Sequence, residues 1–251
     1  MAKTSPMNGS SSFDVRLGKW TRREFRQAMQ ADQLKGCILP LAAVEQHLEH
    51  MAMEHDWRSV NVVARQVAEG LSPHVLVAQG IMAGISEHHM RHPGTLTLSP
   101  GTFLSVVNDL IDSLVRAGFK NILVLNGHGG NVIPCQQTWD QFLRRYQINL
   151  HFLSYWDVLG QEDALELLEG GHRLPEDLPG HAQEFETSMA LKWFPENVRA
   201  VAMHDQQDRS PLLGTSEKGE ALTRRIVTRL TDYLAEMIQG TKEQTIPPFH
   251  P

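Results

Sequence analysis

Histidines and carboxylates gather in four short clusters of this 251-residue sequence. The chain holds 13 histidines, more than one residue in twenty, and most of them lie next to acidic residues. Imidazole and carboxylate groups side by side are typical of acid–base sites and of sites for divalent transition metals. The chemistry of this protein should therefore be sought in these clusters.

The first cluster contains Glu45, His47 and Asp56. Glu45 and His47 follow an apolar run, and residues i and i+2 of an extended backbone project to the same side, so both can aim at one point. Asp56 comes eleven residues after Glu45, where it could act as a further ligand or cap a helix. We interpret the neighbouring Glu54 and His55 as the solvated start of that helix.

The second cluster contains Ser86, Glu87, His88, His89 and His92. Three histidines within five residues favour the wall of a pocket, or the support of a loop, over a set of metal ligands. A Pro-Gly pair follows directly and predicts a turn.

The third cluster is the glycine-rich segment NGHGGN at residues 126–131. One interpretation is a loop between a strand and a helix that binds a phosphate through its backbone. The segment lacks the signature of a P-loop and has no clean GxGxxG pattern. We favour the second interpretation, in which His128 is a metal ligand and the glycines leave room for a substrate.

The fourth cluster, GHAQEFETS, contains His181, Glu184 and Glu186. Both glutamates could simply stabilise the start of a helix through its dipole. On a helix two such residues diverge by about 200°, so only one of them can face a bound ion.

Together the clusters supply a mixed donor set, made up of Glu45, His47, Asp56, His128 and one of Glu184 or Glu186. Carboxylates and imidazoles without a thiolate suit Zn²⁺, Mn²⁺ or Fe²⁺ better than Ca²⁺ or Cu(I). One or two such ions per chain could activate water and polarise a carbonyl, so the set predicts metal-assisted hydrolysis.

Short apolar runs alternate with amphipathic segments, which predicts an α/β protein with a parallel or mostly parallel sheet covered on both faces. Strands are expected at 35–43, 74–79, 121–125 and 149–156, and helices at 20–33, 55–71, 100–118, 132–146, 184–193 and 216–238. The clusters follow such runs, as expected at the carboxyl edge of a parallel sheet. We expect one domain over 13–240, between a flexible tail at 1–12 and an irregular tail at 241–251.

Composition excludes several other classes of protein. A net charge of −6 argues against nucleic acid as a partner, because no basic face is implied. The chain has no run of 18 apolar residues, so no membrane span is expected. Only two cysteines are present and no apolar leader is visible, which predicts a cytoplasmic protein.

In this order, the four clusters resemble the creatininase family of metal-dependent amidohydrolases. The resemblance extends roughly from Trp20 to Ile238. The matching segments are Glu45-Gln46-His47 with Asp56, Gly84–His88, Pro93–Thr95, Asn126–Asn131 and His181–Ser188. It implies a three-layer α/β/α fold with a mostly parallel sheet, a small-molecule substrate and a homo-oligomer, often a hexamer.

The resemblance also assigns roles to individual residues. Glu45, Asp56 and His128 would hold one metal ion. His47, a bridging Asp56 and Glu186 would hold the second. His181 would donate a proton or orient the substrate, and Glu184 would assist the catalytic site. Contacts with the substrate would come from Glu49, His50, Ser86, Glu87, His88, Gly129, Gly130 and Trp156.

Two departures from the family pattern bear on the substrate. The creatinine-hydrolysing member has Glu where this chain has Gly130, and Leu48–Met51 replaces the usual Gly-Pro-His-Leu. The additional Glu49 and His50 suggest a more polar substrate. The resemblance implies hydrolysis of a small, cyclic substrate at an amide or related C–N bond. An alternative is ring opening at a C–C bond of an oxidised cyclic polyol of the dehydro-inosose type. Rival classes are an anion-binding, flavodoxin-like module and a peptide-processing protein.

Overall fold

Four parallel strands form the central sheet of the computed structural model, which describes residues 13–169, 178–246 and 248. The strands are β1 (Gly36–Leu41), β2 (Val75–Val77), β3 (Asn121–Asn126) and β4 (Asn149–Ser154), and they pair in the order β2-β1-β3-β4. The parallel sheet predicted from the sequence is therefore confirmed. The predicted tail at 1–12 lies outside the described residues, as does part of the tail at 241–251.

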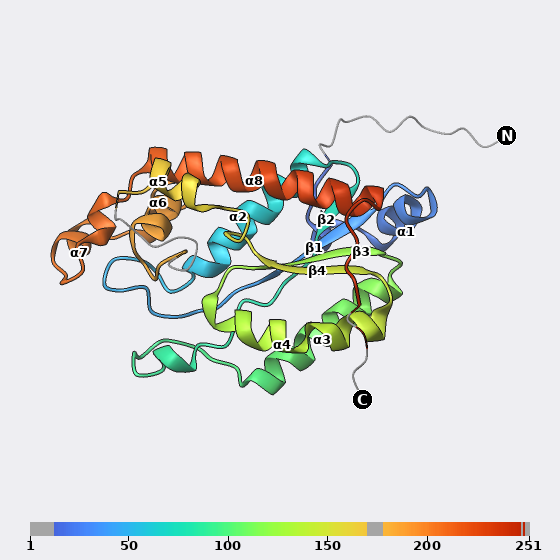
Figure 1. Cartoon of the computed structure of the whole chain (residues 1–251), viewed down its shortest axis with the longest axis horizontal. Helices are drawn as coiled ribbons and strands as arrows, with labels where there is room; N and C mark the ends of the chain where they lie inside the picture. The colour runs from blue at the N-terminus through green and yellow to red at the C-terminus, as the bar shows by residue number, and fades with distance from the viewer. Residues whose placement is uncertain (1–12, 170–177, 247, 249–251) are drawn as a thin grey trace.

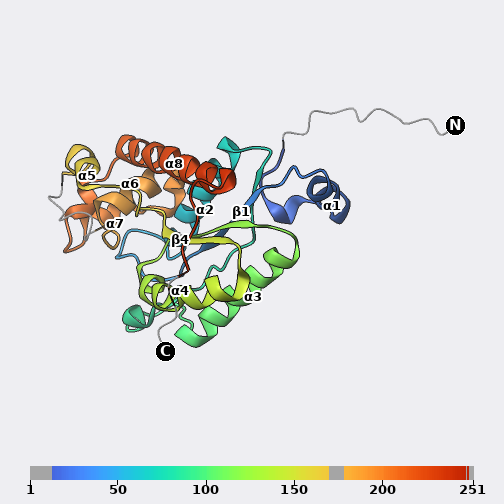
Figure 2. The same cartoon turned by 45° about the vertical axis from the view of Figure 1, so that its right-hand side comes forward.

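Helices cover both faces of this sheet, which gives three layers (Figure 1). One face carries α2 (His55–Gly70) and α8 (Ser216–Gln239), and the other carries α3 (Pro100–Arg116) and α4 (Val132–Tyr146). Three shorter helices gather at one end of the molecule in both views: α5 (Gln161–Leu167), α6 (Glu184–Trp193) and α7 (Ala200–His204) (Figures 1 and 2). The helix α1 (Arg22–Gln30) lies at the other end.

Alternation along the strands divides the core between the two faces. Ile38 of β1 packs with Val60 of α2 and Leu230 of α8 in one apolar cluster. Its neighbour Leu39 points to the opposite face and packs with Phe103 of α3 in a second cluster. Strands buried on both faces are almost continuously apolar, which is why the sequence pattern revealed them.

Most helix boundaries follow signals in the sequence. The side chain of Thr21 accepts a hydrogen bond from the backbone of Glu24 and the Glu24 carboxylate accepts one in return, the capping box that the sequence predicted for α1. The helices α5 and α7 were not predicted. Helices of seven and five residues are too short to show a helical period, so they escape this kind of analysis.

The sheet brings two of the predicted clusters together at its carboxyl edge. Leu41 at the end of β1 is paired with Asn126 at the end of β3. The side-chain amide of Asn131 donates to the Ala42 carbonyl and to the Asn126 side chain, which ties the two loops together. Among the described residues, no helix is long and apolar enough to cross a membrane.

Candidate active site

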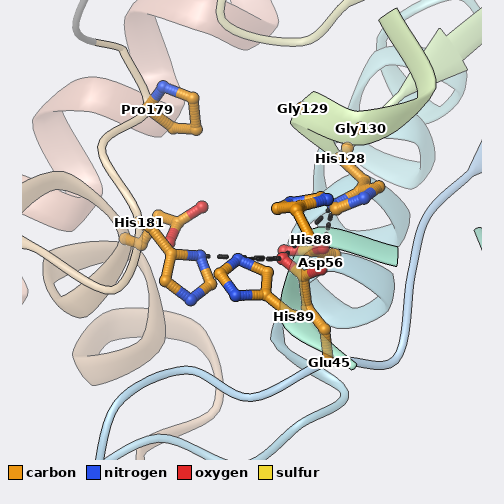
Figure 3. A pocket seen from close by; sticks show the side chains of 11 residues that line it. Glu45, Asp56, His88, His89, His128, Gly129, Gly130, Pro179 and His181 are labelled. Carbon is orange, nitrogen blue, oxygen red and sulfur yellow. Dashed lines mark ion pairs between the residues drawn. The ribbon is translucent and has the colours of Figure 1, made fainter. Parts of the chain in front are cut away.

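A pocket of about 280 Å³ lies at the carboxyl edge of the sheet (Figure 3). It is lined by Glu45, Asp56, His88, His89, Gly127, His128, Gly129, Gly130, Pro179, His181 and Glu186. All four clusters of the sequence contribute to this lining. Residues that are up to 141 positions apart therefore meet at one point, as their placement after apolar strands suggested.

Three buried carboxylates lie at this pocket. Glu45 follows β1, Asp56 lies in the first turn of α2, and Glu186 lies in the first turn of α6. Each of them is at most 3% exposed. Burying carboxylates at one place is costly unless positive charge compensates them, so this arrangement requires cationic partners.

His47 is one such partner, and its orientation is fixed by the backbone. Its Nδ1 donates to the carbonyl oxygen of Glu45 at 3.0 Å. Its Nε2 is therefore directed to the carboxylates, 3.0 Å from Asp56 Oδ1 and 3.7 Å from Glu186 Oε2. A carbonyl behind one ring nitrogen is the arrangement that prepares the other nitrogen to bind a metal.

His128 is held in the same way. Its Nε2 donates to the carbonyl oxygen of Ile85 at 3.0 Å. Its Nδ1 lies 3.0 Å from Asp56 Oδ2 and 3.4 Å from Glu45 Oε1. We refer to Glu45, His47, Asp56, His128 and Glu186 as the carboxylate centre.

Proton affinities in the carboxylate centre reflect the concentration of negative charge. Burial alone would lower the pKa of His47, but Asp56 and Glu186 outweigh it and raise that pKa to about 9. Burial likewise opposes ionisation of His128, yet Asp56 and Glu45 raise its pKa to about 10. Burial and the Asp56 charge raise the pKa of Glu186 to about 8, although His47 opposes the shift. Without a metal, protons thus compensate the carboxylates.

The carboxylate centre fits divalent metal ions. The buried carboxylate oxygen Glu45 Oε2 has no hydrogen-bond partner among the described residues, and Asp56 Oδ2 is buried against His128 Nδ1. Ligand atoms of His47, His55, Asp56 and Glu186 lie within 4.8 Å of one another, and so do those of Glu45, His88 and His128. A dense set of carboxylates and imidazoles without a thiolate suits Zn²⁺, Mn²⁺ or Fe²⁺.

Three further histidines form another side of the pocket. The rings of His181 and His89 stack with centroids 4.3 Å apart, and both are directed to the carboxylates (Figure 3). The ring of His88 stacks on His128 at 5.8 Å. We call His88, His89 and His181 the histidine wall. His88 and His89 come from the second cluster, for which the sequence predicted the wall of a pocket, and His181 comes from the fourth.

His55 was predicted incorrectly. The expectation was a solvated residue at the start of a helix, but its side chain is buried and its Nε2 lies 4.0 Å from Glu186 Oε1. Burial, reinforced by the charge of His47, holds the pKa of His55 well below its usual range. The helix α2 packs against α6 at this point, and that contact could not be read from the local sequence.

The two glutamates of the fourth cluster diverge as a helix requires. Glu186 faces His47, whereas Glu184 forms an ion pair with Lys218 of α8 at 2.6 Å and accepts the backbone N–H of Glu169. Glu184 does not line the pocket. Its expected part at the catalytic site can therefore only be indirect, through the position of α6.

Several predicted substrate contacts lie away from the pocket. Trp156 belongs to the hydrophobic core, where its ring packs edge-on against Tyr155. The imidazole of His50 is buried against Thr187, and burial lowers its pKa to about 4. Glu49 lines a separate cavity of about 620 Å³, and Glu87 is exposed on a short turn outside the lining.

The other predicted contacts do lie at the pocket or next to it. Gly129 and Gly130 line it, as does His88. The hydroxyl of Ser86 lies 3.3 Å from His128 Nε2, behind the carboxylate centre. A Cβ atom on Gly130 would lie 2.1 Å from the carbonyl oxygen of Ile85, so only glycine fits this position.

Gln46 was assigned no role at the site from the sequence. The side-chain amide of Gln46 lies 2.9 Å from His89 Nδ1 and 2.7 Å from His181 Nε2. The alternation rule that placed Glu45 and His47 together directs Gln46 to the other side. The position of a polar residue between the candidate ligands Glu45 and His47 was the signal that could have indicated a role for Gln46 at the site.

Known proteins resemble all or part of this chain. The family model for creatininase, described as creatinine amidohydrolase, matches residues 18–229. The creatinine amidohydrolase of Pseudomonas putida is 30% identical over 92% of this chain and 100% of that enzyme. The 3-dehydro-scyllo-inosose hydrolase of Thermotoga maritima is 31% identical over 66% of this chain and 53% of that enzyme. A mycofactocin precursor peptide peptidase of Mycobacterium tuberculosis is 31% identical over 38% of this chain and 41% of that protein.

Solved structures show the same fold. A creatinine amidohydrolase superposes with a TM-score of 0.78 at 25% identity, covering 90% of this chain and 98% of that one. A manganese creatininase gives 0.76 at 25% identity, covering 89% and 98%. A creatininase variant of the Zn-Zn type also gives 0.76 at 25% identity, over the same shares of the two chains.

Proposed function

Because the chain belongs to the creatininase family and is a hydrolase, we propose that it is a metal-dependent enzyme that hydrolyses a C–N bond, such as a cyclic amide, in a small polar substrate. One observation supports this most strongly. His47 and His128 are each held from behind by a backbone carbonyl, with the other ring nitrogen directed into a set of buried carboxylates.

Two ions can be accommodated by the same residues. Glu45, Asp56 and His128 would hold one ion, while His47, Asp56 and Glu186 would hold the other. The relatives named for manganese and for a pair of zinc ions are consistent with this assignment. Such ions supply a lowered pKa for water and a polarised carbonyl group on the substrate.

The rest of the pocket positions the substrate. His181 and His89 would form hydrogen bonds with the carbonyl oxygen or the leaving group, because both rings are directed into the pocket. Gly129 and Gly130 let the substrate approach the backbone of their loop. A volume of about 280 Å³ lies just below the range of about 300–1,000 Å³ that is usual for small-molecule pockets, which favours a compact substrate over a peptide.

A second candidate reaction is ring opening at a C–C bond of an oxidised cyclic polyol. Phe, Tyr and Trp are absent from the described residues that line the pocket, and Trp156 lies in the core instead. A lining made of carboxylates, imidazoles and glycines suits the hydroxyl groups of a polyol. The inosose hydrolase relative makes this substrate class a specific candidate.

The rival non-enzymatic interpretation was an anion-binding module built on the segment NGHGGN. The chain belongs to a family of hydrolases, and His128 of that segment contacts carboxylates rather than an open loop. Both points favour the enzyme. We further propose a homo-oligomer, from the family resemblance, and a location in the cytoplasm, from the low cysteine content. Light scattering and cell fractionation test these two points.

Metal analysis followed by a substrate panel tests the proposed function. The protein is purified without chelator, counted for Zn, Mn and Fe, and assayed on cyclic amides, formamides and oxidised inositols. We expect at least one ion per chain and turnover that a chelator removes and the metal restores. Less than about 0.3 ion per chain after reconstitution, or turnover that survives metal removal, would contradict the proposal.

A further inference from the structure

Gln46 makes three polar contacts that together fix its orientation. The backbone N–H of Leu48 donates to Gln46 Oε1 at 2.9 Å. A backbone N–H can only donate, so this contact identifies the oxygen of the amide. The NH₂ group is therefore the one that lies 2.9 Å from His89 Nδ1 and 2.7 Å from His181 Nε2.

This orientation determines where the two imidazoles carry their protons. An amide NH₂ has two hydrogens to donate and no lone pair to offer. His89 Nδ1 and His181 Nε2 must therefore accept. Each neutral ring then carries its proton on the other nitrogen, His89 Nε2 or His181 Nδ1, and these lie 3.8 and 3.6 Å from Glu45 Oε1.

The carboxylate centre shows the opposite arrangement. Behind His47 and His128 stands a carbonyl oxygen, which accepts a hydrogen bond from the ring N–H, so the other ring nitrogen can offer its lone pair to a metal ion once its proton is released. Behind His89 and His181 stands a donor, which leaves an N–H group facing the pocket. Metal-binding histidines almost always have an acceptor behind them.

We propose that Gln46 is a positioning residue that holds His89 and His181 as N–H donors to the substrate and thereby keeps them from binding metal. The inference rests on the proposed function in taking the pocket as the substrate site. Glu45, His89 and His181 come close enough together to hold an ion. Because the amide fixes their protons, the two imidazoles can donate hydrogen bonds to substrate oxygen or nitrogen atoms on which negative charge develops during the reaction.

The substitution Gln46→Glu tests this directly. It keeps the size of the side chain and an acceptor for Leu48, but it replaces the donor by a second acceptor. We expect the nitrogens next to residue 46, His181 Nε2 and His89 Nδ1, to be unprotonated in the wild type and protonated in the variant. Solid-state ¹⁵N NMR of the zinc-reconstituted enzyme, labelled at its histidine rings, measures whether each of these nitrogens is protonated. The variants His181→Gln and His89→Gln assign the signals to the two residues.

A matched control is available in Gln206→Glu. Gln206 Nε2 lies 3.2 Å from His50 Nδ1, away from the pocket, so the same chemical change there should leave the His89 and His181 signals unchanged. In Gln46→Glu, kcat should fall more than about 10-fold. A wild-type spectrum with protonated nitrogens next to Gln46 would overturn the proposal.

Metal counting separates this inference from the proposed function. His89→Gln should bind as many ions as the wild type, and a lost ion would overturn the inference. A protein that binds no ion at all would instead contradict the proposed function. The protonation of His89 and His181 could still be measured in that metal-free protein.

Discussion

The carboxylate centre and the histidine wall face the same pocket but are built differently. The centre stands on strand ends and helix starts, and its side chains are at most 4% exposed. The wall comes from a short turn and a loop, and the side chains of His181 and His89 are 30% and 17% exposed. Backbone carbonyls orient the imidazoles of the centre, whereas one side-chain amide orients two rings of the wall. The fold therefore fixes the proposed metal ligands, whereas two rings of the histidine wall depend on a single side chain for their orientation.

The largest effect is expected from removing a ligand of the centre. Asp56→Ala and His128→Ala should each lower kcat by about 1000-fold or more, because bound metal supplies several kcal/mol of transition-state stabilisation. Circular dichroism should remain native-like, since the apolar core lies on other residues. More than about a tenth of the wild-type rate in either variant would contradict the assignment of Asp56 and His128 as essential ligands of the carboxylate centre.

The centre should also exchange protons for metal. His47 and His128, with pKa values raised to about 9 and about 10, are protonated at pH 7 in the metal-free protein. Each ion must displace such a proton, so its affinity should rise about 10-fold per pH unit from pH 6 to pH 9. Where Glu186 also releases a proton, below its pKa of about 8, the rise should approach 100-fold per unit. Calorimetry in two buffers of different ionisation enthalpy measures the number of protons released on metal binding. Metal binding without proton release would contradict the protonation of His47 and His128 in the metal-free protein.

The two glutamates of α6 test which residues belong to the carboxylate centre. Glu186→Gln should lose one ion per chain. Glu184→Gln should keep both and lose at most about 10–100-fold in kcat, the range for residues that support ligands. The reason is that Glu184 binds Lys218 and the backbone of Glu169 and only fixes the position of α6. Elemental analysis and steady-state kinetics distinguish the two variants. Equal metal loss in both would contradict the assignment of Glu186, and not Glu184, to the carboxylate centre.

The smallest effect is expected in the wall. His88 is exposed and stacks on His128 without a hydrogen bond to it. His88→Ala should raise KM by less than about 10-fold and leave kcat and the metal count unchanged, because a single exposed hydrogen bond contributes about 0.5–1.5 kcal/mol. A lost ion would instead make His88 part of the centre.

Features that depend on the local sequence pattern, such as buried strands and the spacing of candidate ligands, could be predicted from the sequence. The strands β1 and β3 are buried on both faces, and the spacing of Glu45 and His47 places both at the edge of the sheet. Tertiary contacts determined the rest. His55 is buried because α6, 129 positions further on, covers it. The helix α5 is held by Asp163, which pairs with Arg225 and Arg229 of α8.

Gly130 makes this pocket difficult to redesign by a single substitution. Any side chain there would meet the Ile85 carbonyl at 2.1 Å and the His128 ring at 2.5 Å, whereas a Cβ on Gly129 meets nothing within 4 Å. Restoring the glutamate of the creatinine-hydrolysing family member would therefore push apart the two loops that also orient His128. To introduce that glutamate into this scaffold, both loops would have to be exchanged together.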